Sequence, residues 1–317
     1  MKVASLFSGI GGLDKGFIDN GYEIVFANDF DRYAVQTYNA NYNVKAVPAD
    51  ITKFPLENIP DFDVLIGGFP CQPFSMMGHQ QGFEDTRGTL FFRIAEIIDY
   101  QEKVKHHKPQ AIVLENVRAL KTHDKGHTFA RILEILSRDL GYQVFDMILN
   151  SADYGVPQTR NRIYIVCFAD KNITEFNPPE KQKLTYHLQD LLEENVPEKY
   201  YLSERVKKTI LSEGTNLWSA RVETDLPIAR TLCATMGKMH RASQDNYVTQ
   251  NGRLRKLTPR ECARLQGFDG PQTSEFIIPV SDAQAYRQFG NAVTVNVAKA
   301  VAAEVKNVLI EHGDWVD

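Results

Sequence analysis

The sequence predicts an α/β protein with a doubly wound, mainly parallel sheet and a second, smaller domain. In the first half of the chain, short apolar runs alternate with amphipathic stretches, which is typical of strands joined by crossover helices. After Ala169 that pattern stops at the break Asn177-Pro178-Pro179, and a charged, irregular region follows. We therefore expect a large domain over 1–175 plus 286–317 and a smaller domain over 176–285.

The individual elements follow from the same patterning, taken in chain order. Strands are predicted at Val3–Phe7, Glu23–Asn28, Val64–Gly68, Ala111–Glu115, Gln143–Asn150 and Arg162–Ala169. Helices are predicted at Arg32–Tyr42, Thr89–Gln101, Phe129–Leu140 and Val293–Ile310, the last of which returns to the first domain. Because ligands of such sheets bind at the carboxyl ends of the strands, the segments that follow each strand are the candidate site.

Composition sets the broad class of protein. The 317 residues are 43% hydrophobic, which is enough for a sizeable core and excludes a wholly disordered chain. No apolar run of about 18 residues occurs, so no membrane helix is expected. The four cysteines form no CxxC pair, so neither a metal site nor a disulfide framework is expected, and a reducing cytoplasm is the natural setting.

Charge is distributed unevenly along the chain. The net charge is −4, yet residues 200–264 hold twelve Lys/Arg and six Asp/Glu, a local net charge of +6. The remainder carries −10. This asymmetry indicates a basic face for a polyanion, with an ordinary solvated surface as the alternative.

A glycine-rich turn follows the first predicted strand and opens a helix. In LFSGIGG at 6–12, glycines let the backbone approach a ligand closely. Asp29, 20 residues after Gly9, is placed to hold ribose hydroxyls, and Asp50 to meet an adenine amino group. Asp14 stands where a dinucleotide fingerprint has its third glycine, which disfavours a pyrophosphate ligand. A nucleoside without phosphates, such as S-adenosylmethionine, fits better, and a tight turn without a ligand is the alternative.

Three further segments end strands with chemistry-bearing residues. Cys71, in GGFPCQPFS at 67–75, lies between two prolines just beyond a strand, where a thiolate nucleophile or a small buried side chain would fit. Glu115 is a candidate general acid, or a cap for the following helix. Arg160 and Arg162 are two residues apart, so an extended chain would point both to one side, either as a clamp for a carboxylate or phosphate or as an ordinary surface strand.

Taken together and in order, these segments resemble the C5-cytosine DNA methyltransferases over about 1–170 and 254–310. The matching segments are LFSGIGG at 6–12, Asp29, Asp50-Ile51, GGFPCQPFS at 67–75, Glu115-Asn116-Val117, residues 149–158, Arg160 and Arg162, RECARLQGF at 260–268 and QFGNAV at 288–293. The PCQ and RECARLQGF segments are the most specific. The resemblance implies a Rossmann-like, S-adenosylmethionine-dependent methyltransferase sheet with a smaller target-recognition domain.

The resemblance also implies a mechanism that agrees with these roles. The target cytosine is flipped out of the duplex. Cys71 attacks C6 as a thiolate, and Glu115 bonds at N3 and the exocyclic amine while carbon 5 takes the methyl group. Arg162 contacts O2 of the base, and Arg160 supports the site or its phosphate contacts.

By the same resemblance, a set of residues along the strand ends lines the cofactor pocket. The set is Phe7, Gly9, Gly11, Asp29, Phe30, Asp50, Ile51, Pro70, Leu90, Asn291 and Ala292. Phe30 is expected against the adenine, although a phenylalanine in a helix core would look alike in sequence. The stretch Ser75–Thr89 resembles the mobile loop that closes over the flipped base, with Ser75 and Arg87 reaching phosphates.

The region near 203–255 falls where this family keeps its target-recognition residues. Thr231-Leu232 matches a Thr-Leu pair found there. Candidate DNA contacts are Arg221, Arg230, Thr231, Lys238, His240 and Arg241. The chain lacks the glycine-rich run that some members have after Thr-Leu, so no target sequence is transferred from a relative.

The resulting hypothesis is a modification methyltransferase of a bacterium or phage. It acts on double-stranded DNA as a cytoplasmic monomer, with a cognate restriction endonuclease encoded nearby. The nearest alternative is the related enzyme that methylates a tRNA cytosine on the same scaffold, which the basic recognition region disfavours. An NAD-dependent oxidoreductase is disfavoured by Asp14 and by the PCQ cysteine. A catalytically silent DNA-binding protein is disfavoured by the presence of Cys71, Glu115, Arg160 and Arg162.

Overall fold

The computed structural model describes residues 1–70, 90–211, 222–238, 240–241 and 243–315. Contacts divide the chain into two units. The first unit comprises Met1–Leu149, Asn161–Glu180 and Val297–Asp317, and the second comprises Asn150–Arg160 and Lys181–Asn296. These units differ from the expected domains in their bounds: 150–160 and 286–296 belong to the second unit by their contacts, and 176–180 to the first.

Local packing explains why 286–296 joins the second unit. The Tyr286 hydroxyl donates to the Leu257 carbonyl over 2.5 Å. A Cβ at Gly290 would lie 2.2 Å from the amide nitrogen of Ala234, so this glycine lets two backbones of the second unit meet.

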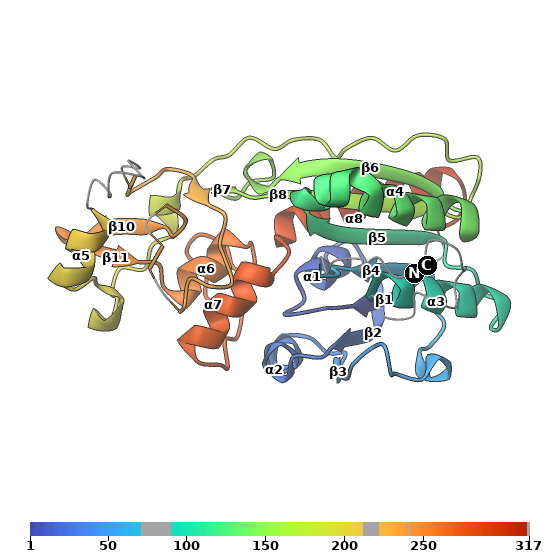
Figure 1. Ribbon diagram of the computed structural model, residues 1–317, viewed down its shortest axis with the longest axis horizontal. Coiled ribbons are helices and arrows are strands. Elements are labelled where there is room, and N and C mark those ends of the chain that lie inside the picture. The colour runs from blue at the N-terminus through green and yellow to red at the C-terminus, as the bar shows by residue number, and fades with distance from the viewer. Residues whose placement is uncertain (71–89, 212–221, 239, 242, 316–317) are drawn as a thin grey trace. The chain divides into compact units, whose positions relative to one another are not determined.

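A seven-stranded sheet forms the centre of the first unit (Figure 1). In spatial order its strands are β3 (Val47–Pro48), β2 (Glu23–Asp29), β1 (Lys2–Leu6), β4 (Val64–Gly67), β5 (Ala111–Val117), β8 (Asn161–Phe168) and β6 (Gln143–Asn150). The neighbours from β3 to β5 pair in parallel, whereas β5 and β8 are antiparallel. The prediction of a doubly wound, mainly parallel sheet is confirmed.

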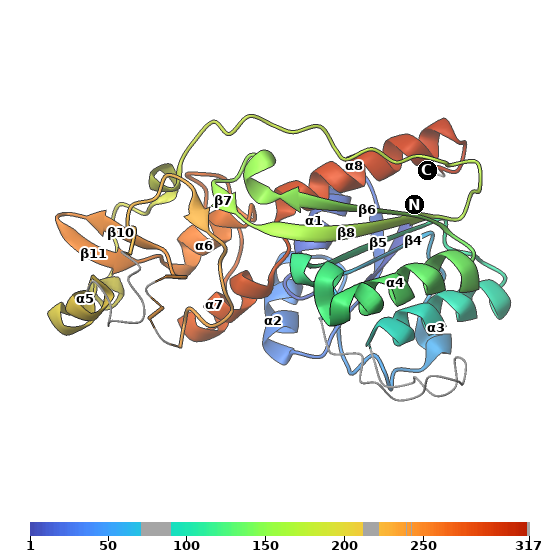
Figure 2. The ribbon, with the colours of Figure 1, turned by 45° about the horizontal axis from the view of Figure 1, so that its top comes forward.

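Helices cover both faces of this sheet (Figure 2). They are α1 (Gly12–Ile18), α2 (Arg32–Asn41), α3 (Leu90–Lys103), α4 (His127–Glu134), which continues as a π turn over Ile135–Asp139, and α8 (Val295–Glu311). Short 3-10 segments lie at Leu56–Asn58 and Arg118–Gly126. On one face, α3 and α4 share a core cluster with alternate residues of the strands, such as Leu65, Ile112 and Ile163. On the other face α1 packs on α8, since a Cβ at Gly16 would lie 2.5 Å from the Lys299 backbone.

The second unit is built from short elements. They are β7 (Gln158–Thr159) parallel to β9 (Ala229–Arg230), β10 (Tyr247–Gln250) antiparallel to β11 (Arg253–Lys256), α5 (Glu204–Ile210), α6 (Pro259–Leu265) and α7 (Asp282–Asn291). Further 3-10 turns lie at Ser151–Asp153, Leu188–Leu191 and Glu198–Tyr200. Among the described residues, no helix is long and apolar enough to cross a membrane.

The start of α6 shows how this unit is stabilised. Thr258 caps the helix in a capping box with Glu261, and Pro259 occupies the first turn. Glu261 also accepts two hydrogen bonds from the Arg255 guanidinium, at 2.7 and 2.9 Å, and both side chains are fully buried. The RECARLQGF segment therefore ties α6 to β11 through a buried bidentate ion pair.

Candidate functional site

The glycine-rich turn after β1 is open on one side and strained. Phe7 has φ of 53°, a left-handed conformation that bulky residues rarely adopt and that tends to occur at functional sites. Gly9 has φ of 55°, and no described heavy atom lies within 4 Å of where its Cβ would stand. Its amide donates to Asp29 Oδ2 over 2.9 Å, which joins the turn to the end of β2.

Gly11 serves the packing of the turn. It has φ of 83°, and a Cβ there would lie 2.3 Å from the ring of Tyr42. The Tyr42 hydroxyl donates to the Gly11 carbonyl over 2.8 Å. The sequence assigned Gly11 to a cofactor alone, whereas Tyr42 already requires a glycine at this position.

Acidic and aromatic side chains lie at the ends of β2 and β3. Asp29 accepts a second hydrogen bond from the Asp31 amide over 2.8 Å. Phe30 is 72% exposed, which excludes the helix-core alternative and leaves its ring available for stacking. Asp50 accepts from the hydroxyl and amide of Thr52, and these bonds hold its pKa below the usual range, so it is ionised at neutral pH.

The remaining expected cofactor residues differ in exposure. Ile51 is buried in the core, Leu90 is half-buried at the start of α3, and Pro70 is exposed at the end of a described range. Asn291 and Ala292 end α7 in the second unit, the first exposed and the second buried. Cys71, Ser75, Arg87 and Arg221 lie outside the described residues.

The segment that leads to Cys71 is nevertheless fixed by β5. The Asn116 side-chain amide, itself buried, donates to the Phe69 carbonyl over 2.8 Å. A Cβ at Gly67 would lie 3.1 Å from the Leu6 carbonyl oxygen, so β4 leaves the sheet close to the glycine-rich turn. In the sequence Asn116 was only part of a motif, and its role as a positioning residue was missed.

Glu115 and Arg162 form an ion pair at the carboxyl end of β5. The antiparallel pairing of β5 with β8 sets Val117 opposite Arg162. Arg162 Nε lies 3.2 Å from Glu115 Oε1, with the side chains 16% and 9% exposed. A nearly buried carboxyl group oriented by a guanidinium can accept a hydrogen bond from an exocyclic amine and, when protonated, donate one to a ring nitrogen.

Arg160 does not share this arrangement, which corrects the expected clamp. β7 ends at Thr159 and β8 begins at Asn161, so the alternation of an extended strand is broken between them. Arg160 is 1% exposed and donates to the carbonyls of Leu232, Gly290 and Ala292 at 2.8–3.1 Å. Of the two roles expected for it, support of the site fits and a phosphate contact does not.

Glutamine side chains extend this buried network within the second unit. Gln158 donates to the Leu265 carbonyl over 2.8 Å and accepts from the Leu232 amide over 2.9 Å. Gln266 donates to the Phe289 carbonyl over 2.6 Å and accepts from the Thr294 hydroxyl over 2.8 Å. With Arg160, these residues connect the Thr-Leu segment to the turn after α7.

Much of the positive charge of residues 200–264 is paired inside the second unit. Arg255 pairs with Glu261, Arg253 with Glu198, Arg260 with Asp269 and Arg230 with Glu223, while Arg264 donates to the Leu191 carbonyl. Arg230 is paired with Glu223 within this unit, and its expected contact with DNA stays a prediction. The segment makes a smaller basic surface than its composition predicted.

Two of the expected DNA contacts keep accessible cationic groups. Lys238 is exposed, and Arg241 is half-buried with its guanidinium 2.9 Å from Gln244 Oε1. Thr231 instead donates its hydroxyl to the Thr159 carbonyl over 2.6 Å.

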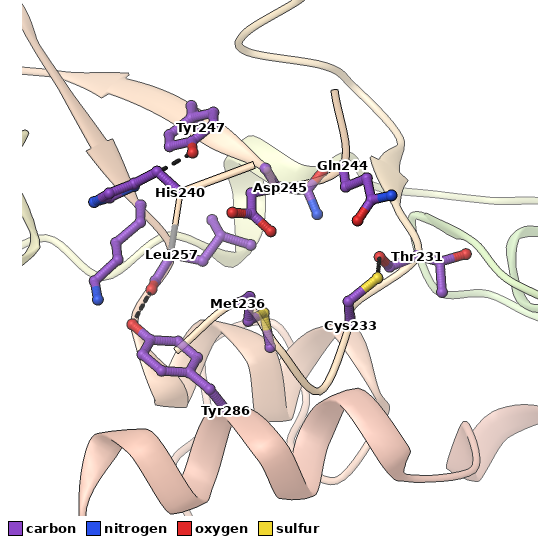
Figure 3. Close-up of a pocket in the computed structure, with 11 residues that line it drawn as sticks. Thr231, Cys233, Met236, His240, Gln244, Asp245, Tyr247, Leu257 and Tyr286 are labelled. Atoms are coloured by element: carbon purple, nitrogen blue, oxygen red, sulfur yellow. Dashed lines mark hydrogen bonds between the residues drawn. The ribbon is translucent and has the colours of Figure 1, made fainter. Parts of the chain in front are cut away.

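A pocket lies beside the segment that follows Thr231 (Figure 3). Its lining is Thr231, Cys233, Met236, His240, Gln244, Asp245, Asn246, Tyr247, Lys256, Leu257 and Tyr286. Figure 3 shows Asp245 directed toward Met236 and Tyr286 across it. Burial and nearby Lys256 lower the pKa of His240, whose ring lies 3.3 Å from the Tyr247 hydroxyl. The sequence named only Thr231 and His240 here, because the other residues carry no motif.

Comparisons with known proteins match nearly the whole chain. A family model described as C-5 cytosine-specific DNA methylase matches residues 1–307. The type II methyltransferase M.DsaV of Dactylococcopsis salina is 42% identical, over 96% of this chain and 86% of that protein. M.NlaX of Neisseria lactamica is 41% identical, over 99% and 98%. A methyltransferase structure from Entamoeba histolytica, EhMeth, covers 97% of this chain and 98% of its own at a TM-score of 0.74 and 21% identity, which shows the fold.

Proposed function

The chain belongs to the C-5 cytosine-specific DNA methylases, and from that premise we propose that it methylates carbon 5 of a flipped-out cytosine in a specific duplex sequence, with S-adenosylmethionine as methyl donor. It is a DNA methyltransferase of the type II restriction-modification kind. The observation that best supports the proposed chemistry is the Glu115–Arg162 pair, in which Glu115 of β5 lies next to Asn116, the residue that holds the segment before Cys71.

In the proposed reaction Cys71 and Glu115 act on opposite parts of the cytosine ring. The Cys71 thiolate forms a bond to C6, and the displaced electron pair moves into the ring toward C5 and N3. Glu115, protonated when the base binds, gives its proton to N3 as charge develops there, and it accepts from the amino group; the proton returns to Glu115 when Cys71 leaves. Arg162 keeps the Glu115 carboxylate in place and contacts O2. After methyl transfer a base removes the C5 proton, and the electrons of that bond expel Cys71.

The first unit carries groups that fit an adenosine-type cofactor. The open side of Gly9 admits a close ligand, Asp29 offers an acceptor for ribose hydroxyls, and exposed Phe30 offers a stacking face. Ionised Asp50 can accept a hydrogen bond from an adenine amino group. When bound, S-adenosylmethionine supplies an electrophilic methyl group.

The second unit is the proposed target-recognition domain. Lys238 and Arg241 are its described candidates for DNA contact, beside the pocket after Thr231. The type II names of relatives at about 40% identity support DNA as substrate, whereas relatives at 21% identity support the fold alone, so the tRNA alternative is not favoured. A partner endonuclease, a monomeric state and a cytoplasmic location remain predictions.

Covalent trapping tests this function. The protein is mixed with S-adenosylmethionine and duplex DNA that carries 5-fluorocytosine, where fluorine at C5 blocks elimination of the cysteine. We expect a denaturation-resistant protein–DNA adduct that is absent in Cys71→Ala, and sequencing of the trapped sites would give the recognition sequence. An adduct with tRNA and none with duplex DNA would overturn the proposed substrate, and no adduct with either would overturn the covalent mechanism.

A further inference from the structure

Asp14 is a buried carboxyl group that the proposed chemistry does not use. It lies in the first turn of α1, directly after the glycine-rich turn, and is fully buried. Its Oδ2 accepts from the Ser5 hydroxyl over 2.9 Å, and its Oδ1 accepts from the Tyr38 hydroxyl over 2.7 Å. One side chain thus joins β1, α1 and α2 beneath the turn.

The partners of Asp14 hold both ends of that turn. Ser5 lies on β1 two residues before strained Phe7, so its bond fixes the entry to the turn. The ring of Tyr38 packs in a tilted arrangement on that of Tyr42, with 4.5 Å between the ring centroids, and Tyr42 donates to the Gly11 carbonyl at the exit. The shape of the backbone between Phe7 and Gly12 therefore depends on the hydroxyl groups that Asp14 organises.

This arrangement requires an ionised carboxylate. An ionised carboxyl group only accepts hydrogen bonds, which suits two hydroxyl donors. Once protonated, it donates to one of the two hydroxyl oxygens, and the proton of that hydroxyl then needs another acceptor in a buried site. Burial raises the pKa of Asp14 to about 6, partly offset by the bonds from Tyr38, Ser5 and its own amide.

The surroundings of Asp14 supply no described counter-charge. The titratable groups that face it are the phenols of Tyr38 and Tyr42. Strand β4, which also packs on α1, is Val64–Gly67 and has no titratable side chain. Strand β2 packs on α1 as well and carries Glu23, which is exposed, and Asp29, which accepts from the Gly9 and Asp31 amides. Lys15 and, from α8, Lys299 pair instead with Asp19 at 3.5 and 3.7 Å. The change of charge near pH 6 therefore belongs to Asp14 itself.

We propose that Asp14 is a positioning residue for cofactor binding, whose ionised carboxylate holds the glycine-rich turn in its binding shape through Ser5 and Tyr38. The inference rests on the proposed use of S-adenosylmethionine. It makes cofactor affinity of the free enzyme depend on pH, with a rise as pH increases through about 6. Asp14 thus stands at the position of the third glycine of a dinucleotide fingerprint, and there its hydrogen bonds hold the conformation of the glycine-rich turn.

The test measures binding of S-adenosylmethionine to DNA-free protein by calorimetry between pH 5 and 7.5. We expect wild-type affinity to rise about tenfold over this range, the scale of one hydrogen bond to a charged group. Asp14→Asn should bind at the low-pH wild-type level throughout, because its amide must also donate. Ser5→Ala should weaken binding above pH 6 and converge with wild type below it. Asp19→Asn, at the C-terminal end of α1, is the matched control and should follow wild type.

Thermal unfolding of the apoprotein gives a second readout with the opposite direction. Because the pKa of Asp14 is raised in the folded protein, the protonated carboxyl group favours folding and the ionised one lowers stability. The stability that the protonated form contributes is lost as pH rises through about 6. As pH rises, the Tm of Asp14→Asn should therefore increase relative to the Tm of wild type. Over the same pH range its affinity for S-adenosylmethionine should fall relative to that of wild type. A flat wild-type affinity profile, or an Asn variant that binds like wild type at pH 7.5, would overturn the inference. Wild type that binds no S-adenosylmethionine at any pH would overturn the proposed cofactor as well.

Discussion

Different kinds of interaction stabilise the interior of each of the two units. In the first, strand residues with apolar side chains on both faces pack between helices, as at Ile112 and Val113, which are both fully buried. In the second, the largest fully buried side chains include Arg160 and Arg255, and their guanidinium groups satisfy carbonyls and a carboxylate. In an apolar core the stability lost on substitution depends on the change in side-chain volume. In a buried polar network, stability depends on every hydrogen-bond partner being present.

Charge follows the same division. The first unit holds 19 Lys/Arg and 26 Asp/Glu, and the second holds 17 and 14. An acidic unit for the proposed chemistry and a basic unit for the proposed recognition would suit an enzyme that must attract a polyanion without binding it everywhere. In the second unit, however, several cations serve the fold, so net charge alone overstates the DNA surface.

The largest expected effect separates chemistry from recognition. Glu115→Gln keeps the shape of the side chain but weakens its interaction with N3 and with Arg162. We expect kcat to fall by about 10²–10⁴-fold, the range for loss of a positioned acid or base, with DNA affinity close to wild type and a lower Tm, because Arg162 loses its carboxylate partner. Single-turnover methylation and a binding assay would show this. Glu134→Gln, a surface change in the same unit, is the control, and an equal loss of DNA affinity in Glu115→Gln would place Glu115 in recognition.

How far the sequence predicts the structure also differs between the units. In the first unit, periodic apolar runs are long, and Gln143–Asn150 was predicted with the bounds of β6. In the second, β7 and β9 have two residues each, too few for any periodic pattern. Arg160 shows the physical limit, since a buried arginine bound to three carbonyls reads in sequence like a cation available for phosphate.

A second prediction tests the polar core of the second unit. Glu261→Gln leaves the Arg255 charge buried without its carboxylate, so the free energy of unfolding should fall by about 3–5 kcal/mol. The double replacement Arg255→Met with Glu261→Leu removes both charges and should recover most of that loss. Urea unfolding monitored by fluorescence would measure both.

The first unit provides the matching control for that experiment. Ile112→Ala should cost about 2–5 kcal/mol by leaving a cavity, and no second replacement of a charged partner can restore it. If the double variant of the second unit were as unstable as Glu261→Gln alone, the ion pair would stabilise this unit through its packing and not through its charges. The two units would then not differ in how their interiors are stabilised.

The smallest expected effect distinguishes cations that face DNA from cations that serve the fold. Lys238 is exposed, and within the described residues its ammonium group has no acidic partner, whereas exposed Arg253 pairs with Glu198. Each phosphate contact contributes about 0.9 to the slope of log affinity against log salt concentration. Lys238→Ala should therefore lower that slope by about one unit and weaken binding alike on cognate and random duplexes, while Arg253→Ala should leave the slope unchanged. Fluorescence anisotropy over a salt series measures both. A lower slope in Arg253→Ala would mean that its pairing with Glu198 opens on DNA, and that the basic surface is larger than the internal ion pairs indicate.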